Sequence, residues 1–468
     1  MNFWTLDRLG QALRGLTRGA TPRGREPLGG VSTDTRTIGT GEVFVALCGE
    51  RLDAHDFLPE AVSRGAAVLV VGDPARAVGL GRPLFAVSDT TAALGALGIY
   101  RRRAWGRPVV AVAGSNGKTT TKELVCAALN AAFTVHATQA NLNNHVGVPL
   151  TLLALDDLAD LAVVEIGTNH PGEVETLRRI IEPDIALVTS VGEEHLEGLG
   201  DLAGVLREET AVYRDSALAI APAAQPEIGA AARSLARQTV EAGLEAGEVR
   251  PDRWGIDAEG RGWADFDGSR LTLAIRGAHN LRNAMLAMAV ARACGVSTEA
   301  AARGIGAVQP LAMRGVWQHL GSLTVINDAY NANPASMREA IAVLDTVSSS
   351  RQRVLVLGTM RELGPRSAEL HAEIARRALG SQADVIAGIG DFASALPALG
   401  ADGARIVTAP DVDELWPLLR GRLAGDAVVL LKASRGVRLE RLVPLLTEWA
   451  QPSQTTDDRR RTTDHSDL

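Results

Sequence analysis

Two of the three lysines in this chain of 468 residues, Lys118 and Lys122, stand in one segment, AVAGSNGKTTTKE. Apart from Lys432, every other basic residue is arginine, so lysine is kept where a compact ammonium is hard to replace. PVVAV predicts a buried strand, residues 114–117 a glycine turn, and Thr119 the start of a helix. Such a loop points backbone N–H groups and the positive end of a helix at a phosphate. Lys118 can then reach the β- and γ-phosphates, and the Thr119 hydroxyl can bind Mg²⁺.

The segment is not a complete G-x-x-x-x-G-K-[ST] motif, because Val112 occupies the position of the first glycine. The alternative is an ordinary tight turn between a strand and a helix, in which the lysine has no special role. GKTT directly after a Val/Ala strand, in a chain that otherwise avoids lysine, favours phosphate binding over this alternative. We therefore interpret the loop as a nucleotide site.

Charge and composition argue against several other classes of protein. The chain has 48 basic and 55 acidic residues and a net charge of −7, unlike a general binder of nucleic acid or anionic membranes. It contains no run of about 18 apolar residues that would span a bilayer, and its first residues lack the apolar stretch of a signal peptide. Cys48, Cys126 and Cys294 lie far apart in apolar surroundings. We expect them to be buried in a reducing cytoplasm, without a disulfide or a metal.

The order of predicted elements indicates an α/β protein with three domains and a tail. In residues 1–83, VSTDTR, EVFVAL and AAVLVV predict short strands, and HDFLPEAVSRG predicts a helix. Residues 84–310 alternate helices with apolar strands such as LAVVEIGT and DIALVTSVG, which is typical of a parallel sheet covered on both faces. Within them, residues 254–276 predict an antiparallel side sheet. Residues 311–452 repeat strand and helix in a doubly wound, Rossmann-like pattern. The polar tail, 453–468, has no apolar period and is predicted to be disordered.

Polar residues follow several predicted strands, and ligands of doubly wound sheets lie outside these carboxyl ends. Glu165 ends a strand and can hold the Mg²⁺ that bridges phosphates, the alternative being a solvated strand-end acid. His195 follows another strand and can contact metal or phosphate, or be a structural histidine. Asp328 and Lys432 end two strands of the third domain. Two such edges facing each other across a cleft would make a two-domain active site.

Two helix starts carry further polar residues. GAHNLRN places His279 and Asn283 one turn apart on one face, where the amide can read an adenine edge; an ordinary helix N-terminus is the alternative. YNANP suits a turn before a helix, with Asn333 and Pro334 in capping positions.

Taken together, these segments resemble the Mur ligase superfamily of ATP-dependent amide-bond ligases over about residues 31–445. The matching segments follow in order: GSNGKTTTKE, EIGTNHPGEVETL, GEEHLEGLG, GAHNLRNAMLA, NDAYNANPASM, VLGTMRELG and LKASRGVRLE. YNANP and LGTMRELG are characteristic of the member that adds D-alanyl-D-alanine to UDP-N-acetylmuramoyl-tripeptide in peptidoglycan precursor synthesis. The resemblance implies that ATP and Mg²⁺ are used and that an acyl phosphate forms. It also implies a nucleotide-sugar domain, a central ATPase domain and a C-terminal ligase domain, in a cytoplasmic monomer without nucleic-acid or membrane partners.

The resemblance also implies roles for individual residues. ATP would contact Gly114, Ser115, Asn116, Gly117, Lys118, Thr119, Thr120, His279, Asn283, Arg314 and Asp328. The other substrates would contact Ser32, Thr33, Asp34, Arg36, Asn143, Asn144, Tyr330, Asn331 and Asn333. The reacting groups would lie near Lys118, Glu165, His195, Glu209, Lys432 and Arg435. The metal would be held by Thr119, Glu165, His195 and Glu209.

The chain departs from the superfamily at Glu209. The family usually has a carbamylated lysine as a metal ligand at the position that aligns with Glu209, but no lysine occurs between Lys122 and Lys432. We expect the Glu209 carboxylate to supply the negative charge directly, through a water molecule. The alternative is that Glu209 is a solvated helix residue and that Glu193 or Glu194 contacts the metal.

Two other functions stay open at this point. One is a different reaction of the same superfamily, such as that of another muramoyl–amino acid ligase or of folylpolyglutamate synthase, which normally lacks the first domain. The other is a nucleotide-binding regulator that does not turn over substrate.

Overall fold

A computed structural model describes residues 3–49, 51–348, 350–400 and 403–451 of the chain. The chain divides into two compact units, residues 1–309 and residues 310–468. The expected tail, 453–468, lies outside the described residues. The division into three domains, with boundaries after residues 83 and 310, stays a prediction. None of the helices in the described part of the chain combines the length and apolarity that a bilayer span requires.

The first unit begins with a small parallel sheet in the order β1-β2-β3-β4. Its strands and helices are β1 (Val31–Ser32), β2 (Val43–Val45), β3 (Val68–Val71), β4 (Leu84–Ala86), α1 (Leu6–Ala12) and α2 (Leu58–Ser63). Alternate residues of β2 and β3 point to opposite faces of the sheet, and each face has its own apolar core. Helix α3 (Thr90–Trp105) follows and packs against α5 (Gly147–Leu153) and α6 (Glu173–Ile181), two helices that accompany the next sheet.

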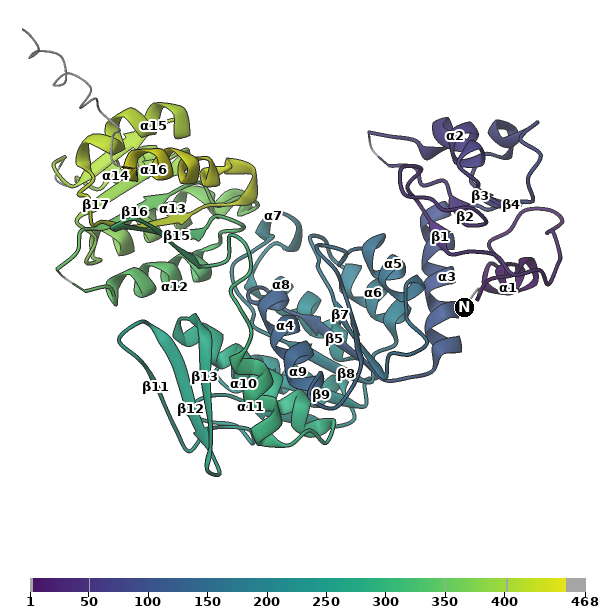
Figure 1. Cartoon of the computed structure of the whole chain (residues 1–468), viewed down its shortest axis with the longest axis horizontal. Coiled ribbons are helices and arrows are strands. Elements are labelled where there is room, and N and C mark those ends of the chain that lie inside the picture. The colour runs from purple at the N-terminus through teal and green to yellow at the C-terminus, as the bar shows by residue number, and fades with distance from the viewer. Residues whose placement is uncertain (1–2, 50, 349, 401–402, 452–468) are drawn as a thin grey trace, which may run out of the picture. The chain divides into compact units, whose positions relative to one another are not determined.

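The central sheet has six parallel strands in the order β10-β9-β8-β5-β7-β6, several of which are labelled in Figure 1. The strands are β5 (Val109–Ala113), β6 (Val135–Ala137), β7 (Leu161–Glu165), β8 (Ile185–Val188), β9 (Leu218–Pro222) and β10 (Thr239–Ala242). The helices are α4 (Lys118–Leu129), α5 (Gly147–Leu153), α6 (Glu173–Ile181), α7 (Leu196–Leu199), α8 (Leu202–Thr210) and α9 (Pro226–Leu235). Since β7, β5 and β8 are neighbours and parallel, the segments that follow them meet at one edge of the sheet.

An antiparallel side sheet and two helices complete the first unit. They are β11 (Arg253–Ile256), β12 (Arg261–Phe266), β13 (Ser269–Arg276), α10 (Ala278–Ala293) and α11 (Thr298–Gly306). Alternate residues of β12 and β13 pack with α10, α11 and α4 in one continuous apolar core. This packing fixes the position of α4, and with it the loop that precedes α4.

The second unit has a six-stranded sheet in the order β14-β15-β19-β16-β17-β18. The strands are β14 (Val316–Leu320), β15 (Leu323–Asp328), β16 (Arg353–Leu357), β17 (Val385–Ile389), β18 (Ile406–Ala409) and β19 (Val428–Lys432). The helices are α12 (Pro334–Asp345), α13 (Ser367–Leu379), α14 (Asp391–Ala398), α15 (Val412–Leu419) and α16 (Leu442–Ala450). All strands are parallel except β14, which pairs antiparallel with β15.

The connections of the second unit predict a crevice for a ligand at one edge of its sheet. The three connections from β15 to β18 run in one direction along the sheet, and the connection from β18 to β19 runs back. Right-handed crossovers therefore place α12, α13 and α14 on one face and α15 on the other. The chain leaves β15 and its neighbour β19 toward opposite faces, so the crevice opens at the carboxyl ends of β15, β19 and β16.

The expected α/β fold is confirmed, with local corrections. The segment VSTDTR forms only the two residues of β1, because the Asp34 side chain accepts the Arg36 N–H in a turn. The helix expected over HDFLPEAVSRG begins as a 3₁₀ turn, Ala54–Phe57, because Pro59 suits only the first turn of α2. Strand β14 was not predicted. The expected burial of the cysteines is wrong for Cys48, which is exposed.

Candidate active site

The loop between β5 and α4 is a glycine turn that leads directly into the first turn of a helix. Gly114 and Gly117 have φ angles of 119° and 80°, which side-chain-bearing residues rarely adopt. Helix α4 begins at Lys118, and no side chain in the described part of the chain caps its first turn. Thr120 lies in the same turn and is half-buried. This is the geometry with which a helix N-terminus binds phosphate.

The end of β8 holds the loop in place from the next strand. Ser115 N–H donates to the Ser190 carbonyl over 2.7 Å, and Asn116 N–H donates to Ser190 Oγ over 3.1 Å. Thr189 Oγ1 donates to the Asn116 carbonyl over 2.6 Å. A Cβ on Gly114 would come within 2.3 Å of Thr189 Oγ1, so only glycine fits there. Sequence analysis missed Thr189 and Ser190, although two polar residues that end an apolar strand are a usable signal.

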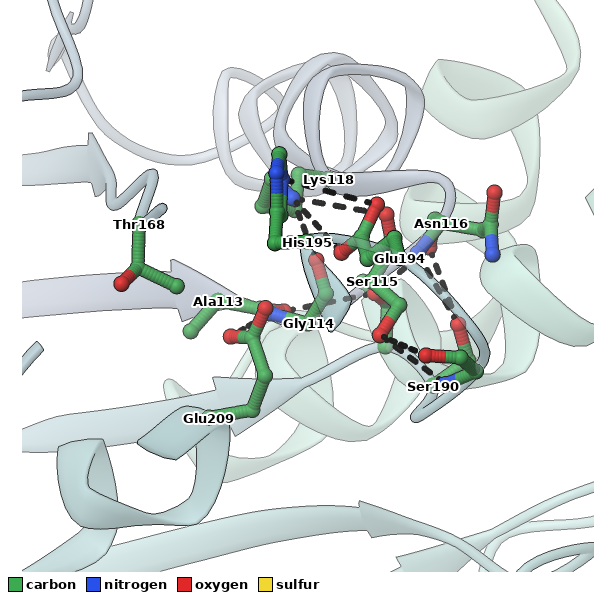
Figure 2. Close-up of polar contacts among 12 residues, drawn as sticks. Ala113, Gly114, Ser115, Asn116, Lys118, Thr168, Ser190, Glu194, His195 and Glu209 are labelled. Atoms are coloured by element: carbon green, nitrogen blue, oxygen red, sulfur yellow. Dashed lines mark hydrogen bonds and ion pairs between the residues drawn. The ribbon is translucent and has the colours of Figure 1, made fainter. Parts of the chain in front are cut away.

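Lys118, Glu194 and His195 gather on one side of this loop (Figure 2). The Lys118 ammonium donates to the Gly114 carbonyl over 2.6 Å and lies 3.7 Å from Glu194 Oε1. His195 Nε2 lies 3.9 Å from Glu194 Oε2. Glu194 is almost fully buried, so its charge is little screened by solvent. The lysine is therefore held near the phosphate loop by main-chain oxygens and by a buried carboxylate.

Glu209 approaches Gly114 from the other side of the loop (Figure 2). Its Oε2 accepts the Gly114 N–H over 2.7 Å, and the residue is only 1% exposed. The pKa of Glu209 is raised to about 7, chiefly by burial and also by the nearby Glu194 carboxylate, whereas Lys118 and the Gly114 N–H act in the opposite direction. The alternative of a solvated Glu209 is therefore wrong.

Thr119 and Glu165 meet at the ends of α4 and β7. Glu165 Oε1 accepts the Thr119 hydroxyl over 3.2 Å and the Asn143 amide over 2.9 Å. Glu165 Oε2 is buried and has no hydrogen-bond partner among the described residues. A buried carboxylate oxygen without a partner is the atom that a bound cation would satisfy. The alternative of a solvated Glu165 is wrong, because this residue is 2% exposed.

The four expected metal ligands do not form one cluster. Thr119 and Glu165 are in contact, whereas Glu209 contacts Gly114 and His195 lies beside Glu194. Within the described ranges, no group of three or more His, Cys, Asp or Glu side chains is arranged to hold a metal ion. Mg²⁺ usually takes only one or two carboxylates and completes its shell with phosphate oxygens and water. The pair Thr119 and Glu165 fits that pattern.

Helix α10 brings Asn283 directly against the phosphate loop. A Cβ on Gly117 would lie 2.7 Å from Asn283 Nδ2, and Asn283 is 8% exposed. His279 stands in the first turn of α10, with its ring beside Gly277. Asn283 therefore borders the loop, and the reading of an adenine edge by either residue stays a prediction.

The expected substrate residues of the first unit form local turns. Ser32 Oγ accepts the Asp34 N–H over 3.2 Å, and Thr33 lies between them, half-buried. Arg36 donates to Asp34 over 2.6 Å and holds the pKa of that carboxyl at about 2. The Arg36 side chain is 83% exposed, so its guanidinium faces solvent. Asn144 Oδ1 caps the first turn of α5 over 2.9 Å, and its contact with substrate stays a prediction.

In the second unit, Asp328 and Lys432 pair at the crevice. They are register partners of β15 and β19, and their charged atoms lie 2.8 Å apart. Lys432 also donates to the Asn331 carbonyl over 2.8 Å and is 4% exposed. The parallel register thus brings together a cation and an anion that the sequence separates by about a hundred residues.

Four more of the residues expected to contact ATP, the other substrates or the reacting groups belong to the second unit. Arg314 stacks on the Tyr330 ring at 4.0 Å, and Arg435 donates to Glu440 over 3.1 Å. Asn333 is buried, and its side chain caps α12 by accepting the Ser336 N–H over 2.9 Å. The capping role that the sequence offered for Asn333 is therefore present, and its contact with substrate stays a prediction.

Comparison with known proteins places these features in one family. Residues 112–291 match the model of the Mur ligase middle domain, and residues 314–435 match that of the Mur ligase glutamate ligase domain. The UDP-N-acetylmuramoyl-tripeptide–D-alanyl-D-alanine ligase of Escherichia coli is 32% identical over 95% of this chain and 98% of its own length. A crystal structure of MurF from Acinetobacter baumannii has a TM-score of 0.86 at 33% identity, covering 95% of this chain and 99% of that one. The MurF ligase of Thermotoga maritima in complex with ADP has a TM-score of 0.79 at 26% identity, covering 90% and 97%.

Proposed function

The chain belongs to the Mur ligase family, and we propose that it joins D-alanyl-D-alanine to UDP-N-acetylmuramoyl-tripeptide with consumption of ATP, in peptidoglycan precursor synthesis. The observation that carries this proposal is a match to ligases of that name over almost the whole chain, at about a third identity. The phosphate loop supports the use of ATP independently, as does the ADP bound to the Thermotoga maritima relative.

The chemistry needs a phosphoryl donor because a carboxylate is a poor acyl donor. Transfer of the γ-phosphoryl group of ATP to the peptide carboxylate gives an acyl phosphate and ADP. The free amine of D-alanyl-D-alanine then attacks the acyl carbon, loses a proton and displaces inorganic phosphate. The protein has to position the reactants and stabilise charge on the transferring group.

Lys118 is the residue we assign to that charge. Its ammonium now donates to the Gly114 carbonyl and lies near Glu194, so binding of a triphosphate requires it to exchange these partners for phosphate oxygens. The N–H groups in the first turn of α4 would bind the remaining phosphate oxygens. His195 lies beside Glu194, where it can orient that carboxylate.

Mg²⁺ fits the pair Thr119 and Glu165. Glu165 Oε2 is buried without a hydrogen-bond partner among the described residues, and the Thr119 hydroxyl already contacts the other oxygen of the same carboxylate. When bound, Mg²⁺ neutralises charge on the phosphates. Asn143 donates to Glu165 Oε1, and so it orients the carboxylate.

We propose that the Glu209 carboxylate, when ionised, supplies negative charge directly beside the loop. This carboxylate is buried and already contacts Gly114, so no carbamylation is needed to produce an anion at this position. The cytoplasmic location and the monomeric state remain predictions.

The test is ADP release by the purified full-length enzyme with ATP, UDP-N-acetylmuramoyl-tripeptide and D-alanyl-D-alanine. We expect release to require both peptide substrates and the ligated product to appear in equal amount. Lys118→Met should reduce the rate by about a thousandfold, whereas Arg25→Lys, which changes a 95% exposed side chain, should not.

Other outcomes would favour the rival functions. Release with a single amino acid in place of the dipeptide, or with a folate in place of UDP-N-acetylmuramoyl-tripeptide and an amino acid as the amine, would identify another ligase of the family. Nucleotide binding without release under any substrate combination would indicate a regulator. Joining of the two peptides at the normal rate by Lys118→Met would contradict the proposed role of the loop.

A further inference from the structure

His371 is a buried histidine that the chemistry above does not use. It lies on α13, is 1% exposed and packs against the Phe392 ring, with centroids 4.9 Å apart. Both of its ring nitrogens are engaged. Met360 N–H donates to Nε2 over 2.9 Å, and Nδ1 lies 2.7 Å from the Ser367 carbonyl.

These partners fix the protonation state of the ring. A backbone N–H can only donate, so Nε2 must carry a lone pair, and a carbonyl can only accept, so Nδ1 must carry the proton. The ring is therefore neutral in this arrangement. Burial lowers the pKa of His371 from its ordinary value of 6.5, in the direction of this neutral form.

The ring holds the segment that follows β16, residues 358–362. This segment is also tied to the end of β19: Gly358 N–H donates to the Lys432 carbonyl over 2.9 Å, and Ser434 N–H donates to the Thr359 carbonyl over 3.2 Å. Arg361 N–H donates to Ser434 Oγ over 3.0 Å. The segment thus forms the wall of the crevice at the carboxyl ends of β16 and β19, directly beside Lys432.

The segment is strained, and so it needs such a support. Glu362 has a φ of 64°, which non-glycine residues rarely adopt. Met360 is 1% exposed, and its N–H has the His371 ring as acceptor. Loss of the acceptor would leave a buried N–H without a partner at a cost of about 1–3 kcal/mol. Release of the segment would relieve both this cost and the backbone strain.

We propose that His371 is a positioning residue for the second substrate: as a neutral ring it accepts the Met360 N–H and fixes the segment 358–362 as the wall of the crevice that receives D-alanyl-D-alanine. The proposal rests on the proposed function. Arg361 and the Lys432–Asp328 pair place charged groups of both signs at this edge, which suits a free dipeptide because its carboxylate and its amine also carry opposite charges.

Protonation of the His371 ring tests this proposal in the native enzyme, because the Asp391 carboxylate can accept a hydrogen bond from the protonated ring. The Asp391 carboxylate on α14 lies 3.6 Å from Nε2 and raises the pKa of the ring, against the effect of burial; the other charged side chains of the 358–362 segment are Arg361 and Glu362. A proton on Nε2 would remove the acceptor of Met360 N–H and turn the ring toward Asp391. Low pH should therefore free the segment 358–362 in the native protein, as a substitution of His371 does.

The experiment measures kcat and the KM of each of the three substrates for His371→Ala and His371→Gln in the full-length enzyme. The glutamine carbonyl can replace Nε2 as an acceptor and cannot be protonated in the range tested. His319→Ala is the matched control, because His319 is an exposed histidine on β14 of the same unit. Circular dichroism reports whether each variant folds.

We expect His371→Ala to raise the KM for D-alanyl-D-alanine by about tenfold, the equivalent of one lost buried hydrogen bond. The KM for ATP should stay within about twofold, and His371→Gln should recover most of the loss. In the native enzyme this KM should rise in acid, at a pH lower than the ordinary pKa of histidine because burial lowers the pKa of His371, and in His371→Gln it should stay flat.

Three results would overturn the proposal. They are an unchanged dipeptide KM in His371→Ala, an equal rise of all three KM values, and an acid rise that persists in His371→Gln. If His371→Ala fails to fold, the glutamine variant and the native pH profile decide the matter by themselves. Failure of the proposed function would look different, because the native enzyme would then show no dipeptide-dependent ADP release at all.

Discussion

Replacement of Glu209 by glutamine should make the protein more stable and the enzyme slower. The amide carbonyl can still accept the Gly114 N–H, so the hydrogen bond to the loop is kept while the charge is removed. Since burial raises the pKa of Glu209 from 4.5 to about 7, the ionised side chain costs the folded state on the order of 3 kcal/mol above neutral pH. The substitution removes this cost.

The sign of the pH dependence follows from the raised pKa. The unfolded chain ionises Glu209 near 4.5, whereas the folded protein keeps the proton up to about 7. The stability that the protonated side chain contributes is therefore complete below about pH 4.5 and is lost as the pH rises to about 7. We expect the two proteins to unfold alike near pH 4.5, and Glu209→Gln to be more stable by up to about 3 kcal/mol at pH 8.

Urea unfolding at a series of pH values measures this difference, without nucleotide or Mg²⁺. Glu208→Gln is the control, because Glu208 is the neighbouring buried glutamate and holds the start of α6 by accepting the Gly172 and Val174 N–H groups. We expect it to destabilise the protein at every pH. ADP release by Glu209→Gln should fall by about a hundredfold or more, as for loss of an electrostatic contact in a transition state.

Two results would refute this reasoning. If Glu209→Gln is no more stable than the native protein at about pH 8, burial does not penalise the charge. If the variant keeps full activity, the charge has no role in the reaction. At controlled bicarbonate, Glu209→Lys should recover activity only when bicarbonate is supplied, since a carbamate would restore the anion; Glu209→Ala should not recover under either condition.

Two further predictions concern the elements that hold the phosphate loop. Gly114→Ala should weaken ATP binding by about tenfold or more and destabilise the protein by about 1–3 kcal/mol, because its Cβ would collide with Thr189. Isothermal titration with ATP measures the binding, and thermal unfolding measures the stability. The control is Gly172→Ala, which should show the backbone strain alone, because Gly172 also has a positive φ but has open space around it. Lys122→Met should lower the free energy of unfolding by about 1–3 kcal/mol, because the buried Thr138 carbonyl loses its donor. The control for the second prediction is Arg25→Met, which removes a cation that is 95% exposed and should cost less than about 0.5 kcal/mol in urea unfolding.

The sequence was most informative where local pattern and chemistry agree. The apolar runs around Val109–Ala113 and Leu161–Glu165 are strands because only buried parallel strands carry such uninterrupted apolar residues. The glycine turn before Lys118 was readable for the same reason, since few other structures require glycine, lysine and threonine in that order.

The sequence was least informative where partners come together through the sheet. Asp328 and Lys432 meet because β15 and β19 are neighbours in parallel register, and that neighbourhood is a property of the whole topology. Strand β14 escaped prediction because it is a half-exposed edge strand with mixed polarity. Likewise, no local pattern connects His371 with Met360 or Glu209 with Gly114, since each bond joins elements that only the folded chain brings together.

The three lysines share one structural property that explains why they persist in a chain rich in arginine. Each ammonium donates to a main-chain carbonyl in a buried or half-buried setting: Lys118 to Gly114, Lys122 to Thr138 and Lys432 to Asn331. A guanidinium in these places would bring five donors in a rigid fork, and most of them would be left without acceptors. A compact ammonium can also exchange a carbonyl for a phosphate oxygen by rotation of its stem. Two of the three, Lys118 and Lys432, end at the sheet edges where ligands of parallel sheets bind, so in this chain the choice of lysine over arginine is itself a signal of function.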